Sequence, residues 1–208
     1  MIEKLVLPYI GANCYVVICD VSKKAILIDP GSGSRMILER VKDLGVQVEI
    51  IVLTHGHFDH IGAVEEVRHA LGAKVAIHTD DADMLSDPSK NVSALFGSKK
   101  TFSAAEILLE DGQEICVGNK KMKVIHTPGH TPGGICLLDE ADNALFSGDT
   151  LFCGAIGRSD FPGGDLRQLI NGIESKLMVL DDGIRVFPGH EASTTIGQER
   201  RYNPFLMG

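Results

Sequence analysis

Short hydrophobic runs, bounded by polar or glycine-containing turns, recur along the chain and predict β-strands. Their aliphatic and β-branched side chains are typical of strands that are buried within a sheet. The predicted strands are Cys14–Cys19, Ala25–Ile28, Val48–Leu53, Lys74–Ile77, Lys121–Ile125, Ile135–Leu138, Ala144–Phe146 and Ile184–Phe187.

Hydrophobic residues at helical spacing predict helices between these strands. One helix begins at Ser34 and stops at a glycine, a second spans Ile61–Leu71, and a third spans Leu166–Leu180. Residues 79–110 are expected to be mostly helix or loop, and the polar stretch 80–103 either covers a functional site or is a plain surface excursion. Helices spread among many strands favour an α/β or α+β domain in which helices cover sheets.

Composition and charge restrict the classes of protein that this chain resembles. The 208 residues fit a single domain, 1–208, and 44% hydrophobic with 23% charged residues is typical of a folded globular protein. A formal net charge of −8 argues against nucleic acid as a partner, because that affinity depends on Lys and Arg neutralising phosphates. Hydrophobic runs are too short to cross a membrane. The sequence does not indicate an oligomeric state.

The cysteines and the N-terminal segment predict a cytoplasmic location. Five cysteines are an odd number, they lack CxxC spacing, and a chain of this size has no need of disulfides for stability. No segment resembles a cleavable signal peptide. We therefore expect reduced thiols in a cytoplasmic protein.

The segment HGHFDH, residues 55–60, directly follows the predicted strand Val48–Leu53. Neutral imidazole and carboxylate groups are good ligands for zinc and other first-row divalent metals. Gly56 allows a tight turn that lets neighbouring side chains converge. A solvated polar loop is the less favoured alternative. The candidate metal ligands of this segment are His55, His57, Asp59 and His60.

Three further candidate ligands each follow a predicted strand and a glycine. His130 lies in TPGHTPG, Asp149 in SGD and His190 in PGH. Loops at the carboxyl ends of strands gather functional groups at one edge of a sheet, so we expect these residues to meet residues 55–60. The remaining histidines lack this arrangement and are assigned to the surface or the core: His69, His78 and His126.

Five histidines and two aspartates exceed the ligands that one tetrahedral ion needs. They are enough for two ions that share a carboxylate and a solvent-derived hydroxide. Such a pair lowers the pKa of bound water and polarises a carbonyl or phosphoryl oxygen. The sequence therefore predicts metal-assisted hydrolysis.

The order of these motifs resembles the metallo-β-lactamase superfamily: HxHxDH at 55–60, GH at 129–130, GD at 148–149 and GH at 189–190. The resemblance spans nearly the whole chain and implies an αββα sandwich with a dinuclear site at one edge of the sheets. It implies that the first metal is held by His55, His57 and His130, the second by Asp59, His60 and His190, with Asp149 as the bridge. Asp29, in IDPG, matches an aspartate that supports such sites through a metal-binding histidine.

Within the superfamily, 148–152 and 157–165 are similar to the glyoxalase II-like hydrolases, and most of all to their short bacterial branch. This resemblance implies a thioesterase of the hydroxyacylglutathione hydrolase type, without the C-terminal helical domain that grips glutathione. Arg158 stands where the family has a basic residue near the glutathione part of the substrate, but Ser159 and Asp160 replace a usual aromatic pair. Alternatively, Arg158 pairs with Asp160 and holds a glycine-rich loop.

The expected reaction is attack of a metal-bridging hydroxide on a small-molecule thioester, with Asp59 and Asp149 as catalytic metal ligands. The expected cofactors are two divalent ions, zinc first, with iron or manganese as alternatives. A persulfide dioxygenase with one iron on His55, His130 and Asp149 is the main rival. A non-catalytic binding module on the same fold is less favoured, because every candidate ligand is present.

Overall fold

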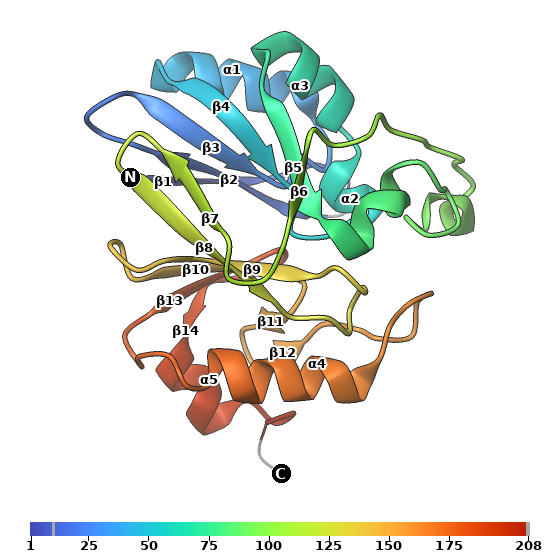
Figure 1. The fold of residues 1–208 in the computed structure, drawn as a ribbon, viewed down its shortest axis with the longest axis vertical. Coiled ribbons are helices and arrows are strands. Elements are labelled where there is room, and N and C mark those ends of the chain that lie inside the picture. The colour runs from blue at the N-terminus through green and yellow to red at the C-terminus, as the bar shows by residue number, and fades with distance from the viewer. Residues whose placement is uncertain (10, 207–208) are drawn as a thin grey trace.

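The computed structural model, which describes residues 1–9 and 11–206, has four layers in the order helix, sheet, sheet, helix (Figure 1). The two central sheets have six strands each. Helices α1 and α3 cover the outer face of the first sheet, and α4 and α5 lie against the second (Figure 1). This is the mixed α/β sandwich that the sequence predicts.

The first sheet has the strand order β1-β2-β3-β4-β5-β6, with antiparallel pairing from β1 to β3 and parallel pairing from β3 to β6. Its strands are β1 (Ile2–Val6), β2 (Asn13–Ile18), β3 (Lys24–Ile28), β4 (Gln47–Val52), β5 (Lys74–His78) and β6 (Ile107–Leu109). The helical segments of this half are α1 (Ser34–Leu44), α2 (Phe58–Ile61), α3 (Val64–Leu71), and the 3₁₀ turns η1 (Thr79–Leu85) and η2 (Ser93–Phe96).

The second sheet has the order β14-β13-β10-β9-β8-β7, and a two-stranded hairpin, β11 with β12, lies beside it. Its strands are β7 (Glu114–Val117), β8 (Lys120–His126), β9 (Ile135–Asp139), β10 (Ala144–Gly148), β13 (Arg185–Pro188) and β14 (Thr194–Thr195). The remaining elements are β11 (Leu151–Phe152), β12 (Ala155–Ile156), α4 (Leu166–Gly172), a π-helical turn η3 (Ile173–Leu177) and α5 (Ile196–Tyr202).

Strands that are buried on both faces explain the unbroken hydrophobic runs of the sequence. In β2, Val16 packs into the core under α1 and α3, whereas Tyr15 and Val17 face the core between the sheets. Between the sheets, the ring of Tyr15 meets the edges of Phe146 and Phe187, with centroids 5.2 and 5.8 Å apart. A third hydrophobic cluster lies between the second sheet and its helices.

The structure corrects several predicted elements. The helix predicted at Ile61–Leu71 is broken, because the N–H of Ala63 bonds the carbonyl of Pro30 instead of continuing a helix from α2 into α3. The helix predicted to reach Leu180 widens into the π turn at residue 173 and ends at Leu177. Strands β6, β7, β11, β12 and β14, and most of β1, lie where no strand was predicted. Within the described residues, no helix is both long and hydrophobic enough to cross a bilayer.

Candidate metal centre

Loops from both sheets meet at one edge of the sandwich, and they bring all the predicted ligands together. The loop after β4 and helix α2 supply the residues of the HGHFDH segment, whereas His130, Asp149 and His190 follow β8, β10 and β13. The carboxyl end of each strand therefore points to this edge, as the sequence predicts.

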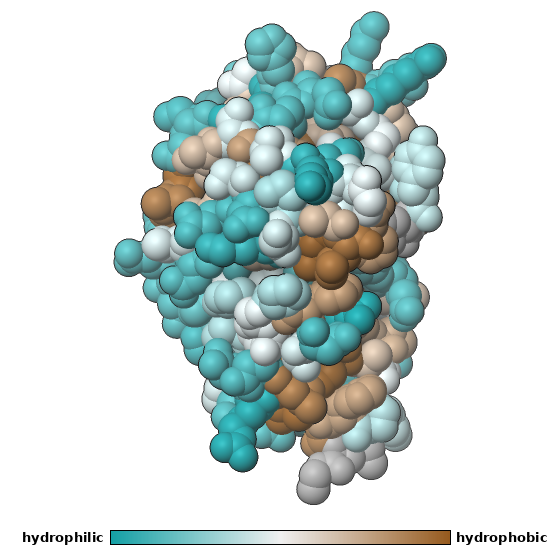
Figure 2. All heavy atoms as spheres, turned by 90° about the vertical axis from the view of Figure 1, so that its right-hand side faces the viewer, coloured by the Kyte–Doolittle hydropathy of each residue, from teal (hydrophilic) through white to brown (hydrophobic). Residues whose placement is uncertain are grey.

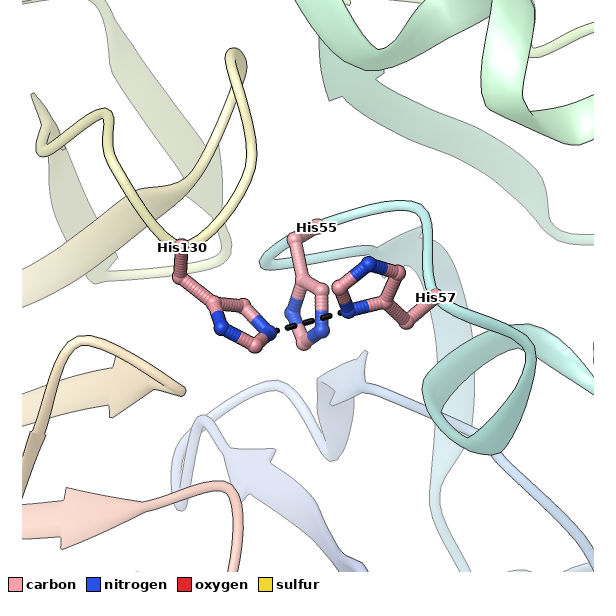
Figure 3. Close-up of side chains that lie close together, drawn as sticks. All are labelled: His55, His57 and His130. Carbon is pink, nitrogen blue, oxygen red and sulfur yellow. Dashed lines mark hydrogen bonds between the residues drawn. The ribbon is translucent and has the colours of Figure 1, made fainter. Parts of the chain in front are cut away.

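Three buried histidines form a first group, which Figure 3 shows as three rings turned toward one another. One ligand atom from each of His55, His57 and His130 lies within 4.8 Å of the others. Nδ1 of His57 and Nε2 of His130 are 2.9 Å apart. Among the described residues, the Nε2 atoms of His55 and His57 have no hydrogen-bond partner although both are buried. Unpartnered buried nitrogens are costly, and a metal ion would use the lone pair of His55 Nε2.

A second group contains Asp59, His60 and His190. One ligand atom from each of these residues lies within 4.8 Å of the others. Nε2 of His60 lies 3.2 Å from Nε2 of His190, and Oδ2 of Asp59 lies 3.4 Å from the same His190 atom. Helix α2 places Asp59 and His60 at adjacent positions, and His190 comes from the other sheet. Two imidazoles and a carboxylate form a donor set that suits zinc or iron.

The carboxylate of Asp149 lies between the two groups. Its Oδ2 is 3.6 Å from Nε2 of His130 in the first group and 3.6 Å from Nε2 of His190 in the second. Its Oδ1, 3.4 Å from Nε2 of His60, accepts no hydrogen bond within the described part of the chain. Gly189 allows this approach, because a Cβ at that position would collide with Asp149 Oδ1. One carboxylate is thus within reach of both groups.

Asp29 holds His60 from outside the group. Its carboxylate accepts hydrogen bonds from the N–H of Thr54 at 2.8 Å and from the Thr54 hydroxyl at 2.6 Å. The remaining contact, 3.0 Å to Nδ1 of His60, fixes that ring so that Nε2 faces Asp59 and Asp149. A carboxylate behind an imidazole orients the ring and raises its basicity.

The two groups differ in charge. Burial, with the neighbouring histidines, holds the pKa of His55 well below its usual value and lowers that of His57 to about 3. Burial opposes protonation of His60 too, but Asp149, Asp59 and Asp29 outweigh it and raise its pKa to about 10. Without bound ions, His55 and His57 are therefore neutral imidazoles near pH 7, whereas His60 is a cation beside carboxylates.

Asp81 is an organising residue that the sequence analysis did not identify. Its buried carboxylate accepts hydrogen bonds from the N–H of Gly56 at 3.0 Å, the hydroxyl of Thr131 at 2.7 Å and the N–H of Gly133 at 2.6 Å. It thereby ties the loop of His55 to the loop of His130. Its place directly after β5, as the ligands follow other strands, is the signal that could have identified it.

Arg158 pairs with Asp160 through two 2.7 Å hydrogen bonds, as one of its two predicted roles requires. Its guanidinium lies 3.8 Å over the ring of Phe161, and that ring meets the edge of His57. The carbonyl of Arg158 accepts a 2.7 Å hydrogen bond from Nδ1 of His130. The loop therefore fixes one ring of the first group.

The other histidines lie outside these groups. His69 is exposed, whereas His78 is buried and stacks on the half-buried His126 with ring centroids 3.9 Å apart. The stack joins the end of β5 to the end of β8, so it connects the two sheets. His69 is at the surface and His78 in the interior, as the sequence predicts, but His78, Asp80 and His126 also lie close enough together to form a third group of possible metal ligands.

Comparisons with known proteins agree with this geometry. A family model described as the metallo-beta-lactamase superfamily matches residues 8–190. The hydroxyacylglutathione hydrolase GloC of Haemophilus influenzae is 36% identical over 196 residues, which cover 93% of this chain and 92% of GloC. The crystal structure of the BLEG-1 B3 metallo-beta-lactamase is 39% identical, with a TM-score of 0.96 and full coverage of both chains.

The structure of TTHA1623, solved in a di-iron-bound form, is 34% identical with a TM-score of 0.88, and the match covers 98% of this chain and all of the other. The family match spans nearly all the motifs, from before Asp29 to His190. This chain belongs to the metallo-β-lactamase superfamily.

Proposed function

We propose that this protein is a metal-dependent thioesterase of the hydroxyacylglutathione hydrolase type. Membership of the superfamily indicates a metal-dependent hydrolase, and the likeness to GloC supports a thioester as substrate. The observation that carries the proposal is the position of Asp149, whose carboxylate lies within 3.6 Å of His130 in one group and of His190 in the other. A shared carboxylate between two sets of ligands is the arrangement of dinuclear hydrolases.

The residues present fit two divalent ions. The unpartnered Nε2 of His55 and Oδ1 of Asp149 are buried donors that such ions would use. The first ion would be held by His55, His57 and His130, the second by Asp59, His60 and His190, with Asp149 shared between them. When bound, the ions supply an activated water and polarise the carbonyl oxygen of the substrate. We propose zinc, with iron or manganese as alternatives, because imidazole and carboxylate serve all three.

The chain positions these groups through the outer nitrogen of each ring. Asp29 holds Nδ1 of His60, and the carbonyl of Arg158 holds Nδ1 of His130. The Nε2 atoms of both rings are therefore directed inward before any ligand binds, and a metal ion at His60 would displace the proton of that ring. A thiolate leaves readily because of its low pKa, so the reaction needs little acid assistance at the sulfur. We further propose a reducing, cytoplasmic location, since all five cysteines are free.

Metal content and hydrolysis, measured together, test this function. We expect about two ions per chain by elemental mass spectrometry of protein purified without added metal or chelator. Hydroxyacylglutathione should be hydrolysed, the activity should be lost on chelation, and zinc should restore it. The matched control is His69→Ala, an exposed histidine outside the site. Close to one iron per chain, with oxygen consumed on a persulfide and no thioester hydrolysis, would replace this proposal with a dioxygenase.

A further inference from the structure

The third group of possible metal ligands shares no residue with the candidate centre. It consists of His78, Asp80 and His126, which lie at or just after the ends of β5 and β8, and one ligand atom from each lies within 4.8 Å of the others. Two imidazoles and one carboxylate are the same donor set as that of the second group. Such a set suits zinc and other first-row divalent ions.

The carboxylate of Asp80 faces a nitrogen of each ring. Its Oδ2 lies 3.7 Å from Nδ1 of His78 and 3.8 Å from Nε2 of His126. Both distances are too long for hydrogen bonds, so this oxygen faces the two nitrogens without bonding either. Around a tetrahedral ion with bonds of about 2.0–2.1 Å, ligand atoms are about 3.3–3.4 Å apart. A small movement of Asp80 therefore brings the oxygen to the separation that an ion requires.

The two rings stack with their centroids 3.9 Å apart and their planes at 16°. Nearly parallel rings direct their lone pairs side by side, so one ring has to turn before both bind the same ion. His78 is buried and His126 is half-buried, so His126 is the ring with room to turn. Its backbone is fixed, because its N–H donates a 2.7 Å hydrogen bond to Oδ1 of Asp111. The change is therefore confined to one side chain.

The third group is open to solvent on the side of Asp80, which is exposed. Figure 2 faces the side on which residues 79–103 lie in Figure 1, and it shows hydrophilic groups between hydrophobic ones. An ion can therefore enter here and keep water at the positions that the three side chains leave open. A recess of about 210 Å³ adjoins the group and is lined by Asp80, Met84, Lys90, Pro132, Pro162 and Gly163.

The third group also contacts the loop that carries His130. Nε2 of His126 donates a 2.8 Å hydrogen bond to the carbonyl of Pro132, two residues after His130. Asp80 directly precedes Asp81, which accepts hydrogen bonds from the same loop. An ion on Nε2 of His126 would replace the proton of the first hydrogen bond and release the Pro132 carbonyl. Binding at the third group would therefore loosen a loop that holds a ligand of the first group.

We propose that His78, Asp80 and His126 form an additional binding site for a divalent transition-metal ion such as zinc, which fills when the metal is in excess and loosens the His130 loop. The ion takes the place of the Nε2 proton of His126, which passes to solvent. Binding replaces the hydrogen bond to Pro132 and a 3.2 Å hydrogen bond from the N–H of Asp80 to Nδ1 of His78.

The additional site is expected to be weaker than the candidate centre. An ion in the third group has to replace existing hydrogen bonds, whereas Nε2 of His55 and Oδ1 of Asp149 in the centre have no partner among the described residues. The centre should therefore fill first, and the third group only at higher free zinc.

Zinc binding by matched variants tests the site. Asp80→Asn removes the carboxylate, and Asp83→Asn, at an exposed position of the same 3₁₀ turn, is its control. His126→Gln removes the imidazole but keeps an amide N–H that can donate to Pro132. Each protein is dialysed against increasing free zinc, and the ions bound per chain are counted by elemental mass spectrometry. Hydrogen exchange of residues 127–134, followed by mass spectrometry, reports on the loop.

At zinc concentrations above those that fill the centre, the wild type and D83N should bind about one ion per chain more than D80N and H126Q. The affinity for this ion should fall about tenfold or more in D80N, because the loss of even a partner behind a ligand costs about 10–100-fold. Exchange of residues 127–134 should become faster as the ion binds to the wild type or D83N. In D80N and H126Q the same zinc concentrations should leave the exchange unchanged.

The outcomes decide the site and its coupling separately. If D80N and H126Q bind as many ions as the wild type with the same affinity, the ion binds elsewhere and the inference is wrong. If the additional ion is lost in both variants but never alters the exchange of residues 127–134, the coupling to the His130 loop is wrong and the site stands. Neither readout uses a thioester, so failure of the proposed function would not change this test.

Discussion

The polar residues around the site act mainly by fixing the direction of a few imidazole nitrogens. The carboxylate of Asp29 and the carbonyl of Arg158 each occupy Nδ1 of a histidine, and the hydroxyl of Thr54 lies 3.1 Å from Nδ1 of His55. Each ring is therefore restrained in its pocket without a metal. Such outer contacts set the affinity of a metal site as well as its geometry.

At the residue scale, Asp149→Ala tests the shared ligand. The substitution leaves both groups of histidines in place but removes the carboxylate that lies between them. We expect kcat for thioester hydrolysis to fall at least 100-fold and at least one ion per chain to be lost. Elemental analysis and initial rates measure both effects. Asp20→Ala, at an exposed position, is the control, and full activity with full metal content in D149A would contradict the dinuclear proposal.

Asp81→Asn tests a carboxylate that contacts no predicted ligand side chain. An amide nitrogen in place of an oxygen disrupts one or more of the hydrogen bonds from Gly56, Thr131 and Gly133. We expect metal affinity to fall about 10–100-fold and the free energy of unfolding to fall by about 1–3 kcal/mol. A competitive chelator titration and urea denaturation measure these quantities. The exposed Asp83→Asn should change neither.

At the element scale, the site depends on how closely α2 approaches the loop after β3. A Cβ on Gly31 would overlap the carbonyl of Asp59, and one on Gly62 would overlap the carbonyl of Gly31. The first turn of this helical region is thus packed directly against backbone. The same contact redirects the N–H of Ala63 to Pro30 and separates α2 from α3.

Gly31→Ala should therefore displace α2 and the two ligands that it carries. We expect loss of ions from the second group and a fall of 2 kcal/mol or more in the free energy of unfolding, about the upper part of the range for single substitutions. Gly172→Ala is a matched control, because its Cβ would make only ordinary contacts, 3.7 Å or longer, inside α4. That variant should be neutral or slightly more stable.

The elements differ in how far the sequence could predict them. Strands such as β4 and β9 are buried on both faces, so their hydrophobic runs identify them directly. Strand β6 has only three residues at the edge of a sheet, and β7 alternates exposed and buried positions, so the hydrophobic run of each is too short to identify a strand. The break after α2 depends on a backbone contact with a loop about 30 residues away in sequence, which local periodicity does not encode.

The ligands were predictable because residues 55–60 form one motif directly after a strand and the other three each follow a strand and a glycine, and the structure places all of them at one edge. Asp81 was missed because its partners are mostly backbone N–H groups of distant loops. The pairing of Arg158 with Asp160 was one of two alternatives, since two residues so close in sequence can either pair or bind a substrate separately.

At the scale of the whole molecule, the two sheets each supply part of the candidate centre. Residues 55–60 belong to the first half, and His130, Asp149 and His190 belong to the second. Outside the centre, the contact between the sheets is a hydrophobic core around Tyr15 and Phe146. Bound ions would add a polar cross-link at one edge of that core.

Metal removal should therefore destabilise the entire fold and not only the site. At free metal about 100 times the dissociation constant, ions that bind only the folded state add about 2.7 kcal/mol per independent site. We expect urea denaturation midpoints to fall on chelation, with unfolding still in one transition seen by both circular dichroism and tyrosine fluorescence. The double variant His55→Ala, His130→Ala lacks two ligands of the first group. Chelation should therefore lower its urea midpoint less than it lowers that of the wild type. A chelator-insensitive midpoint in the wild type would contradict a shared centre.

The division of ligands between the two halves has a consequence for biosynthesis. When residues 1–110 have emerged from the ribosome, the HGHFDH segment is exposed. The histidine and aspartate ligands of the second sheet have not yet been synthesised. The nascent chain can then hold an ion only weakly and with the wrong set of neighbours. On the dinuclear proposal, productive loading would be post-translational or would occur at the last stage of synthesis, and acquisition of the full complement of ions would mark the docking of the two sheets.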